Sequence, residues 1–252
     1  MSTVSVIILT HNEEENIVDC IQSVSFADQV LVIDDFSTDT TLEKAQQLGA
    51  KVIQHPMNGD FGGQRNFAIA QADTDWILFL DADERISPQL GREIKAVIED
   101  VDRYAYWIVR ENRFHFNKAT HGVLRPDWVL RLIPRDGASV EGYVHEAIRS
   151  TYPSKRLSGP MYHYTYDNWN QYFNKFNNYT TLSAEKYRDK GKSCSFVKDI
   201  ILRPMWAFIK MYILEKGFLD GKIGFILSVN HYFYTMTKYV KLYYLNKSNG
   251  KL

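Results

Sequence analysis

One short stretch constrains the fold more than any other. Residues 76–80, Trp-Ile-Leu-Phe-Leu, are uniformly apolar and are followed at once by Asp81-Ala82-Asp83-Glu84. Five large apolar residues are too few for a helix of usual length and are typical of a strand covered on both faces, as in a parallel sheet. If the strand geometry continues, Asp81 and Asp83 project from the same face. The stretch therefore predicts a buried strand that ends in two neighbouring carboxylates.

These carboxylates have two interpretations. Two negative groups aimed at one place repel each other unless a cation lies between them, and oxygen ligands suit Mg²⁺ or Mn²⁺. The carboxyl edge of an open α/β sheet is also where ligands bind. Alternatively, the acids form a turn into the next helix, with Asp83 or Ser87 as the helix cap. The residues alone leave both interpretations open.

The first half of the chain alternates strand and helix patterns four times. Strand-type segments at residues 4–9, 29–33, 51–54 and 76–80 are separated by helix-type segments, and the second strand segment ends in Asp34-Asp35. This alternation predicts an α/β fold with a mostly parallel sheet and helices on both faces. The first turn reads Thr-His-Asn-Glu and lacks G-x-G-x-x-G, which argues against a Rossmann dinucleotide site.

Several element boundaries can be predicted from capping chemistry. Asn12 followed by acids indicates a helix that starts there and runs to about residue 24. Ser87-Pro88 indicates another helix start, with serine as the cap and proline at the first helical position. Residues 104–110 and 128–133 are strand-like, which favours a hairpin or an antiparallel addition to the sheet.

The last third differs in charge and composition. From Asn170 onward there are 14 lysines and arginines against 5 acids, a net charge of +9, whereas the preceding residues carry 16 against 25, a net of −9. Helices are predicted at 169–190, 196–216 and 221–245. We therefore expect an α/β domain at residues 1–166 and a helical region at 167–252. In the third helix, tyrosines and phenylalanine lie beside lysines, which suits a membrane interface or packing on the sheet domain or a second subunit.

The cysteines and the hydropathy bear on location. Cys20 and Cys194 are the only cysteines and are far apart, so neither a disulfide framework nor a zinc site is indicated. No window reaches the roughly 18 apolar residues needed to span a bilayer. We expect a cytoplasmic protein, at most peripheral to a membrane.

Four motifs in order resemble one family. They are residues 6–17 (VIILTHNEEENI), 32–41 (VIDDFSTDTT), 62–66 (GGQRN) and the Asp81-Ala82-Asp83 sequence. Together they resemble the family 2 glycosyltransferases, whose nucleotide-sugar-binding fold is called GT-A. The family often has glycine where Phe36 stands, so a slightly different turn is expected there.

Later motifs resemble a narrower subgroup. Residues 144–146 (VHE), His163-Tyr164, Arg203-Pro204 and residues 217–221 (GFLDG) are similar to the bacterial lipopolysaccharide inner-core β-glucosyltransferases. This resemblance implies an inverting transfer of a hexose from a UDP-sugar to a lipopolysaccharide-core or other surface-glycan acceptor. It also implies a membrane-linked acceptor that is reached from the cytoplasmic side, at the inner membrane.

The resemblance assigns roles at the donor site. It implies that Thr10, Asn12 and Glu14 lie near the nucleoside, that Asp35 reads the edge of the uracil ring, and that Arg65 contacts the base or a phosphate. Asp81 would hydrogen-bond the ribose or help to hold the metal. Asp83 would bind the Mn²⁺ or Mg²⁺ that bridges the sugar diphosphate and offsets the charge of the leaving group.

A general base must activate the acceptor hydroxyl. The resemblance favours Glu146, with Glu141 and Asp127 as alternatives and His145 as a positioning group. His163 either completes the metal shell, contacts the diphosphate, or is a packed histidine in an aromatic segment. Diphosphate or anionic-acceptor contacts are expected from Arg125, Arg131 and Arg135, unless these form only a solvated basic strand.

Two other classes of function compete. A sugar-phosphate nucleotidyltransferase shares the α/β nucleotide site and the metal, but it carries a glycine-rich basic loop after the first strand, where this chain is acidic. A non-catalytic membrane-associated scaffold or nucleic-acid binder would use the basic tail. That model leaves the acids at the strand ends unexplained, and acids repel phosphates, so we expect no nucleic-acid partner.

Overall fold

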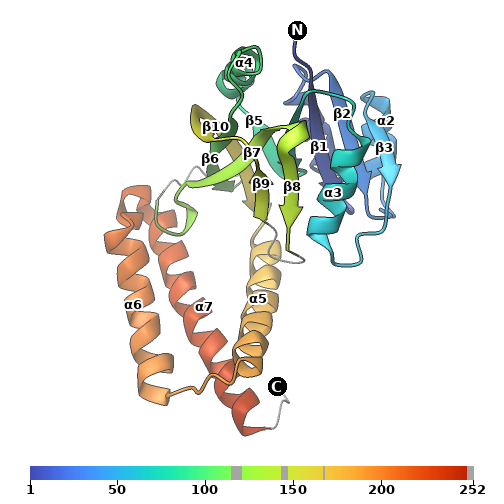
Figure 1. Cartoon of the computed structure of the whole chain (residues 1–252). Coiled ribbons are helices and arrows are strands. Elements are labelled where there is room, and N and C mark those ends of the chain that lie inside the picture. Colours follow the sequence, from blue (N-terminus) through green and yellow to red (C-terminus); the bar gives the residue numbers. More distant parts are fainter. Residues whose placement is uncertain (115–120, 143–146, 167, 249–252) are drawn as a thin grey trace. The chain divides into compact units, whose positions relative to one another are not determined.

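The computed structural model describes residues 1–114, 121–142, 147–166 and 168–248 of the 252-residue chain. The chain divides into two compact units. The first consists of Met1–Glu111 and Asp127–His163, and the second of Asn112–Pro126 and Tyr164–Leu252. Figure 1 shows the elements of both units along the sequence.

An eight-stranded sheet organises the first unit, in the order β3-β2-β1-β4-β7-β6-β10-β5. Strands β1 to β4 pair in parallel, whereas β4 with β7, β7 with β6, and β10 with β5 pair antiparallel. The predicted parallel sheet is thus confirmed for the first four strands, and the later strands make the whole sheet mixed. The strands are β1 Val4–Thr10, β2 Gln29–Asp34, β3 Lys51–Gln54, β4 Trp76–Asp81, β5 Glu84–Ile86, β6 Ala105–Phe114, β7 Asp127–Pro134 and β10 Ser154–Tyr166.

Helices cover both faces of the parallel part. Helices α1 (Ile17–Gln22), α2 (Thr41–Gln47) and α4 (Pro88–Val97) contribute to one core cluster, and α3 (Phe61–Gln71) contributes to the other. The central strand β4 supplies both clusters alternately, with Trp76, Leu78 and Leu80 on one side and Ile77 and Phe79 on the other. All five side chains are fully buried. The prediction of a strand covered on both faces is confirmed.

The start of α1 differs from the prediction. The helix begins at Ile17 rather than at Asn12, because Asn12 adopts a left-handed conformation with φ of 55°. Its Oδ1 accepts a hydrogen bond from Thr38 N at 2.8 Å, so Asn12 ties the loop after β1 to the loop after β2 instead of capping a helix. The prediction for Ser87 is confirmed, since its Oγ accepts from Leu90 N at 3.2 Å.

A two-stranded sheet, β8 (Ala138–Glu141) and β9 (Ala147–Ser150), completes the first unit. Asn66 on α3 fixes β8 through two hydrogen bonds, from its Nδ2 to Val140 O at 2.8 Å and from Val140 N to its Oδ1 at 2.9 Å. The helix that precedes the central strand is thereby attached to the strand pair that follows β7.

The second unit is helical. It contains α5 (Trp169–Asp189), α6 (Arg203–Ile209) and α7 (Gly221–Lys247), and α6 is flanked by π-helical turns at Phe196–Leu202 (η3) and Lys210–Leu214 (η4). Two apolar clusters hold it together, one around Phe114, Tyr172 and Leu227, the other around Ala184, Tyr239 and Leu242. In the described part of the chain, no helix is both long and apolar enough to cross a membrane.

Candidate active site

The loops after β1 and β2 meet at the carboxyl edge of the sheet. Thr10 is paired with Asp34 in the register of β1 and β2, and its Oγ1 donates to Asp34 Oδ1 at 3.1 Å. Asp34 is fully buried and also accepts from Ser37 N at 2.9 Å, so this acid stabilises the turn. The next residue, Asp35, is partly exposed, and its Oδ1 accepts from Met57 N at 2.9 Å. Of the acidic pair, Asp35 is therefore the one available to a ligand.

Glu14 joins the same pair of loops. Its Oε2 accepts from Thr40 Oγ1 at 2.6 Å and from Thr40 N at 3.3 Å, and these hydrogen bonds hold the pKa of Glu14 below its usual value. With Asn12 bound to Thr38, the predicted nucleoside residues lie on two adjacent loops at one sheet edge. The structure thus brings together Thr10, Asn12, Glu14 and Asp35.

Phe36 follows Asp35 in a conformation that favours glycine. Its φ is 53°, in the left-handed region, and its side chain is 53% exposed. Phe36 thus has a φ that glycine adopts freely, and the slightly different turn expected here stays a prediction.

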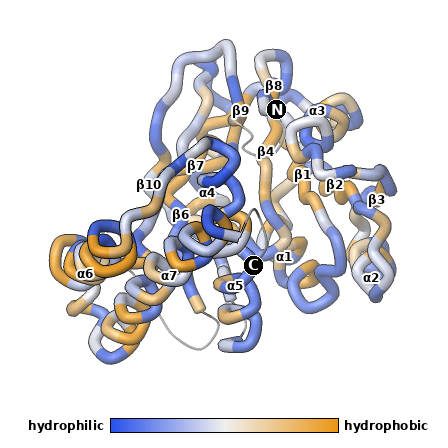
Figure 2. The backbone as a smooth tube through the Cα atoms, turned by 90° about the horizontal axis from the view of Figure 1, so that it is seen from below, coloured by the Kyte–Doolittle hydropathy of each residue, from blue (hydrophilic) through white to orange (hydrophobic). Residues whose placement is uncertain are grey.

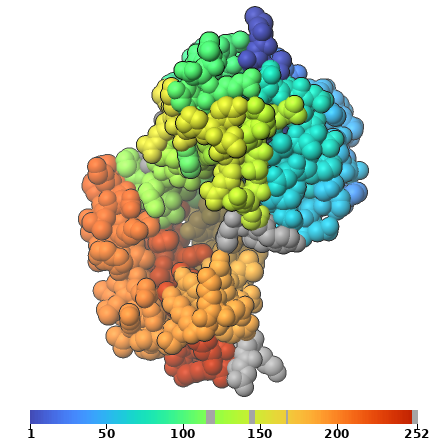
Figure 3. Space-filling view, viewed as in Figure 1, coloured from blue at the N-terminus to red at the C-terminus, as the bar shows by residue number. Residues whose placement is uncertain are grey.

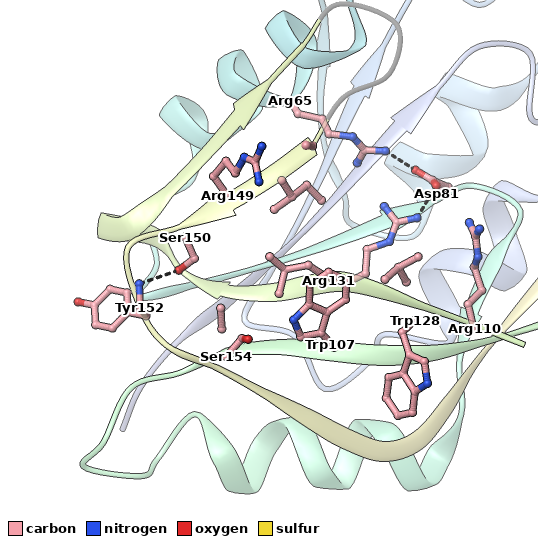
Figure 4. Close-up of a pocket in the computed structure, with 15 residues that line it drawn as sticks. Arg65, Asp81, Trp107, Arg110, Trp128, Arg131, Arg149, Ser150, Tyr152 and Ser154 are labelled. Atoms are coloured by element: carbon pink, nitrogen blue, oxygen red, sulfur yellow. Dashed lines mark hydrogen bonds and ion pairs between the residues drawn. The ribbon is translucent and has the colours of Figure 1, made fainter.

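Asp81, at the end of β4, is held between two arginines (Figure 4). Arg65 on α3 donates from Nη2 to Asp81 Oδ1 at 2.7 Å, and Arg131 on β7 donates from Nη2 to Oδ2 at 2.6 Å. Burial acts to raise the pKa of Asp81, but the two guanidinium groups outweigh it and hold the pKa well below its usual range. Asp81 is therefore a fixed carboxylate, and Arg65 is oriented by it.

Arg131 reaches this position because of a β-bulge. Tyr106 pairs with Leu132 and Trp107 with Leu130, so Arg131 is the extra residue of β7. A bulge re-aims side chains, and here the buried guanidinium contacts Asp81 and also Glu84 Oε1 at 2.9 Å. Burial alone would lower the pKa of Arg131, but the charges of Asp81 and Glu84 outweigh burial, so the pKa lies above its usual value.

Glu84 stabilises the acidic turn, residues 81–84, from its buried side. It is fully buried, and its Oε2 accepts from Asp81 N at 3.0 Å. Burial raises the pKa of Glu84, and the charge of Asp81 adds to this effect, while Arg131 opposes it. Arg85 closes the turn by donating to Ala82 O at 2.7 Å and to Asn16 O at 2.9 Å. The turn that carries Asp83 is therefore rigidly supported.

Asp83 and His163 meet at the same edge. Strand β10 pairs antiparallel with β5, and His163 lies opposite Glu84, which brings His163 Nε2 to 3.2 Å from Asp83 Oδ2. Both side chains are partly accessible, at 28% for Asp83 and 17% for His163. The carboxylate and imidazole of these two residues are thus available to the same small ligand.

This pair fits a divalent cation that is shared with a substrate. Among the residues that the structure describes, no three His, Cys, Asp or Glu side chains converge to hold a metal ion by themselves. Mg²⁺ is commonly bound by one or two carboxylates together with substrate phosphates, and imidazole is an acceptable ligand of Mn²⁺. Asp83 and His163 supply such a partial set, whereas both oxygens of Asp81 are engaged by arginines.

A cavity of about 560 Å³ opens beside Asp81. Arg65, Arg110, Arg131 and Arg149 give it a basic lining, and the indole rings of Trp107 and Trp128 supply an aromatic one. Each indole is more than one third exposed. A pocket with several cations and flat apolar faces suits a ligand that carries both sugar rings and anionic groups.

The remaining predicted residues lie in different places. Glu146 and His145 are outside the described residues. Glu141 is exposed and pairs with Arg149 at 3.0 Å. Both carboxylate oxygens of Asp127 accept hydrogen bonds from Arg110, at 3.0 and 2.8 Å, so Asp127 is an engaged carboxylate.

Two predicted arginines do not join Asp81. Arg135 follows β7, and its N donates to Asp75 O before the start of β4, at the opposite edge of the sheet. Arg125 belongs to the second unit, where its Nε lies 3.6 Å from Glu215 Oε2. Of the three candidates, only Arg131 reaches the acidic turn.

The sequence did not indicate five residues of this site: Glu84, Arg110, Arg149, Trp107 and Trp128. Glu84 looked like one more acid in an acidic turn, because its burial depends on strand β5, which is only three residues long. The two tryptophans did carry a signal, since each lies within a segment predicted to be a strand.

The mixed sheet, the acidic turn and the basic pocket define an α/β protein with a charged candidate site at the carboxyl edge of the sheet. A family model described as glycosyl transferase family 2 matches residues 5–216. The chain belongs to glycosyl transferase family 2 and is a glycosyltransferase. Its fold is of the GT-A class, followed by a helical region. This membership decides against the nucleotidyltransferase and the non-catalytic alternatives.

Individual proteins are similar over most of the chain. An uncharacterized glycosyltransferase of Rickettsia typhi is 30% identical over 256 residues, which cover 96% of this chain and 87% of the relative. The lipopolysaccharide core biosynthesis glycosyltransferase LpsC of Rhizobium meliloti is 26% identical over 248 residues, which cover 95% of this chain and 91% of LpsC. Among solved structures, glucosyl-3-phosphoglycerate synthase from Mycobacterium tuberculosis matches 44% of each chain at 24% identity, with a TM-score of 0.36.

Proposed function

We propose that the protein transfers a hexose from a UDP-sugar, with inversion and with the help of Mn²⁺ or Mg²⁺, to an acceptor in the lipopolysaccharide core or a related surface glycan. The observation that carries this proposal is the meeting of Asp83 and His163 beside the arginine-held Asp81. The similarity to LpsC, whose name places it in lipopolysaccharide core biosynthesis, supports the class of acceptor.

The donor nucleoside binds at the loops after β1 and β2. Asp35 accepts a hydrogen bond from the uracil edge, while its contact with Met57 N keeps the carboxylate oriented. Thr10, Asn12 and Glu14 shape the pocket through the hydrogen bonds that join the two loops. Arg65 and Asp81 form an ion pair in the structure. In the proposed complex, Arg65 faces a phosphate of the donor and Asp81 faces the ribose.

The diphosphate of the donor binds next to the acidic turn that carries Asp83. When bound there, a divalent cation would offset the negative charge that develops on the departing nucleoside diphosphate. Asp83 and His163 would hold it, with phosphate oxygens completing its shell. Glu84 and Arg85 keep Asp83 in place, since they fix both ends of the turn. This preorganisation limits the rearrangement that the site needs when the bond breaks.

The acceptor occupies the basic and aromatic cavity. Sugar rings pack on Trp107 and Trp128, and Arg110 and Arg149 bind anionic groups of the acceptor. Glu146 removes the proton from the attacking hydroxyl. It directly precedes Ala147, which lines the cavity, in the sequence. Asp127 is a weaker candidate for the base because Arg110 engages both of its oxygens.

The acceptor is lipid-linked in this proposal, so the enzyme acts at the cytoplasmic face of the inner membrane. The helical region at residues 167–252 then contacts either the membrane or a second copy of the chain. Vesicle binding together with the oligomeric state in solution separates these alternatives.

Turnover and binding measurements on one variant test the proposed base. UDP release from UDP-glucose or UDP-galactose is measured with Mn²⁺ and a panel of truncated lipopolysaccharide cores, and UDP affinity is measured by calorimetry. We expect Glu146→Gln to keep its affinity for UDP and to lose at least about 100-fold in transfer. Glu141→Gln is the matched control, with little change expected. Normal transfer by Glu146→Gln would remove Glu146 as the base, and no UDP release by the wild type with any sugar or acceptor would count against the proposed reaction.

A further inference from the structure

Residues 196–219 of the second unit expose an unusual number of large apolar side chains. Eleven of them are at least 38% exposed, and Trp206, Phe196 and Val197 each reach 58%. We call this surface the apolar ridge. Its members are Phe196, Val197, Ile201, Leu202, Met205, Trp206, Ile209, Ile213, Leu214, Phe218 and Leu219. Figure 2 shows α6 mostly in the hydrophobic colour, and Figure 3 shows that α6 lies at the surface of its unit.

The helical geometry aligns five of these side chains in a row. Val197, Ile201, Met205, Ile209 and Ile213 follow each other at intervals of four residues. In a continuous α-helix, such a row drifts around the axis, because a turn holds 3.6 residues. The π-helical turns η3 and η4 hold more residues per turn, so their alternation with α6 keeps the row closer to a line.

The opposite side of the same segment is packed. Asp199, Ile200, Pro204 and Met211 are buried, and Ile200 belongs to the apolar cluster that contains Tyr239 and Leu242 of α7. These buried side chains hold the segment in place, so the exposed side chains of the apolar ridge are not needed for its packing. Soluble monomers rarely expose large contiguous apolar patches unless a partner covers them.

The charges around the ridge are positive. The only acids at residues 196–219 are Asp199 and Glu215, and each is paired with an arginine, Asp199 with Arg203 and Glu215 with Arg125. Lys198, Lys210 and Lys216 are exposed along the same segment. Their ammonium groups are carried on long apolar stems that can lie along the ridge with the charge at its margin.

We propose that the apolar ridge inserts in the plane of an anionic bilayer, with the lysines against lipid phosphates. Apolar and aromatic side chains bordered by lysines are the signature of helices that lie in a membrane interface. A second copy is the less suitable occupant, because the region from Asn170 onward carries a net charge of +9, from 14 basic against 5 acidic residues, and would face an equal positive charge. The inference does not depend on the proposed reaction.

The ridge is not the surface that the sequence indicated. For α7 the sequence left a membrane interface and internal packing open. In the structure, Tyr239 is only 3% exposed and packs in the helical core, whereas Phe233 and Tyr244 are 45% and 58% exposed. Lys192 and Lys238 lie over the Tyr239 ring, at 5.1 and 5.2 Å from its centroid, so these two lysines contribute to packing around Tyr239.

Co-sedimentation with vesicles tests the ridge. The full chain is mixed with vesicles of phosphatidylcholine alone and with vesicles that also contain phosphatidylglycerol. We expect binding to the anionic vesicles that weakens with added salt. We expect Leu202→Ser/Trp206→Ser to bind them at least about tenfold more weakly, and Lys198→Glu/Lys210→Glu to lose the preference for anionic lipid. The control is Phe173→Ser/Leu182→Ser, which removes two similarly exposed apolar side chains from α5 and should bind as the wild type does.

Two further measurements keep the result interpretable. Circular dichroism and UDP affinity in solution should be the same in all these variants, which separates lipid binding from folding and from the donor site. Equal vesicle binding by the 202/206 variant and its α5 control would overturn the proposal. A second outcome would also overturn it: light scattering shows a wild-type dimer, and Leu202→Ser/Trp206→Ser is a monomer that binds vesicles as well as the wild type. The ridge would then be a subunit interface.

Discussion

His163 Nε2 lies 3.2 Å from Asp83 Oδ2, although 80 residues separate the two in the chain. The antiparallel pairing of β10 with β5 creates this contact. If the pair holds the metal, His163→Gln should weaken UDP binding about tenfold in Mn²⁺ and less in Mg²⁺, because imidazole is a better ligand for Mn²⁺. Calorimetric titration of UDP in each metal measures this. Unchanged affinity in Mn²⁺ would make His163 a packing residue.

Arg131 should be essential for stability. Replacing it by Met leaves Asp81 and the fully buried Glu84 without their shared guanidinium, and removing one partner of a buried ion pair costs about 3–5 kcal/mol. Urea denaturation of Arg131→Met measures the loss. Arg149→Met is the control, since Arg149 lines the same cavity but is exposed. A loss no larger than that of the control would mean that the bulge arginine does not stabilise the acidic turn. Adding Glu84→Gln to Arg131→Met should restore part of the stability.

Phe36 should be replaceable by glycine. A non-glycine residue in the left-handed region costs on the order of 1 kcal/mol, which approximately offsets the extra flexibility of glycine in the unfolded chain. Phe36→Gly is therefore expected to change the free energy of unfolding by less than about 1 kcal/mol. Phe36→Val should destabilise by about 1–2 kcal/mol, because a β-branched residue fits this conformation worst. The two variants are compared by urea denaturation, and equal stability would show that the turn is unstrained.

His231 should make stability depend on pH. Burial lowers the pKa of His231 to about 4, and the nearby positive charges of Lys238, Arg125 and Lys210 add to this. Between about pH 6.5 and 4, the unfolded chain binds a proton that the folded chain does not, so stability falls as the pH is lowered through this range. The loss attributable to His231 is on the order of 2 kcal/mol at pH 4.5 relative to pH 7.5. Denaturation of the wild type and of His231→Phe at both values measures it, and an identical pH dependence would contradict the assignment.

The parallel half of the fold could be predicted because its determinants are local. Each of the first four strands is a short segment bounded by turn or helix residues. The apolar run at residues 76–80 is buried on both faces, as its composition required. The start of α1 could not be predicted in this way. Asn12 has the chemistry of a helix cap, but its amide instead satisfies Thr38 on another loop.

The site depends on features that have no local signature. The approach of Arg131 to Asp81 requires a bulge in β7, and the burial of Glu84 requires pairing of β5 with β10. Register between distant strands is set by the whole sheet. Likewise, α6 and α7 are both rich in large apolar and aromatic residues. Packing alone determines that Tyr239 of α7 is buried and Trp206 of α6 is exposed.

The central claim is that Asp83 holds a divalent cation for a UDP-sugar, and calorimetric titration of UDP with Mn²⁺ or with EDTA tests it most directly. Asp83→Asn has the same shape as the wild type but lacks the charge. Asp102→Asn is the control, because Asp102 is exposed and far from β4 in the sequence. We expect the wild type and Asp102→Asn to bind UDP at least about tenfold more tightly with Mn²⁺ than with EDTA, and Asp83→Asn to bind equally weakly in both. Wild-type Mn²⁺-dependent affinity in Asp83→Asn would contradict the account.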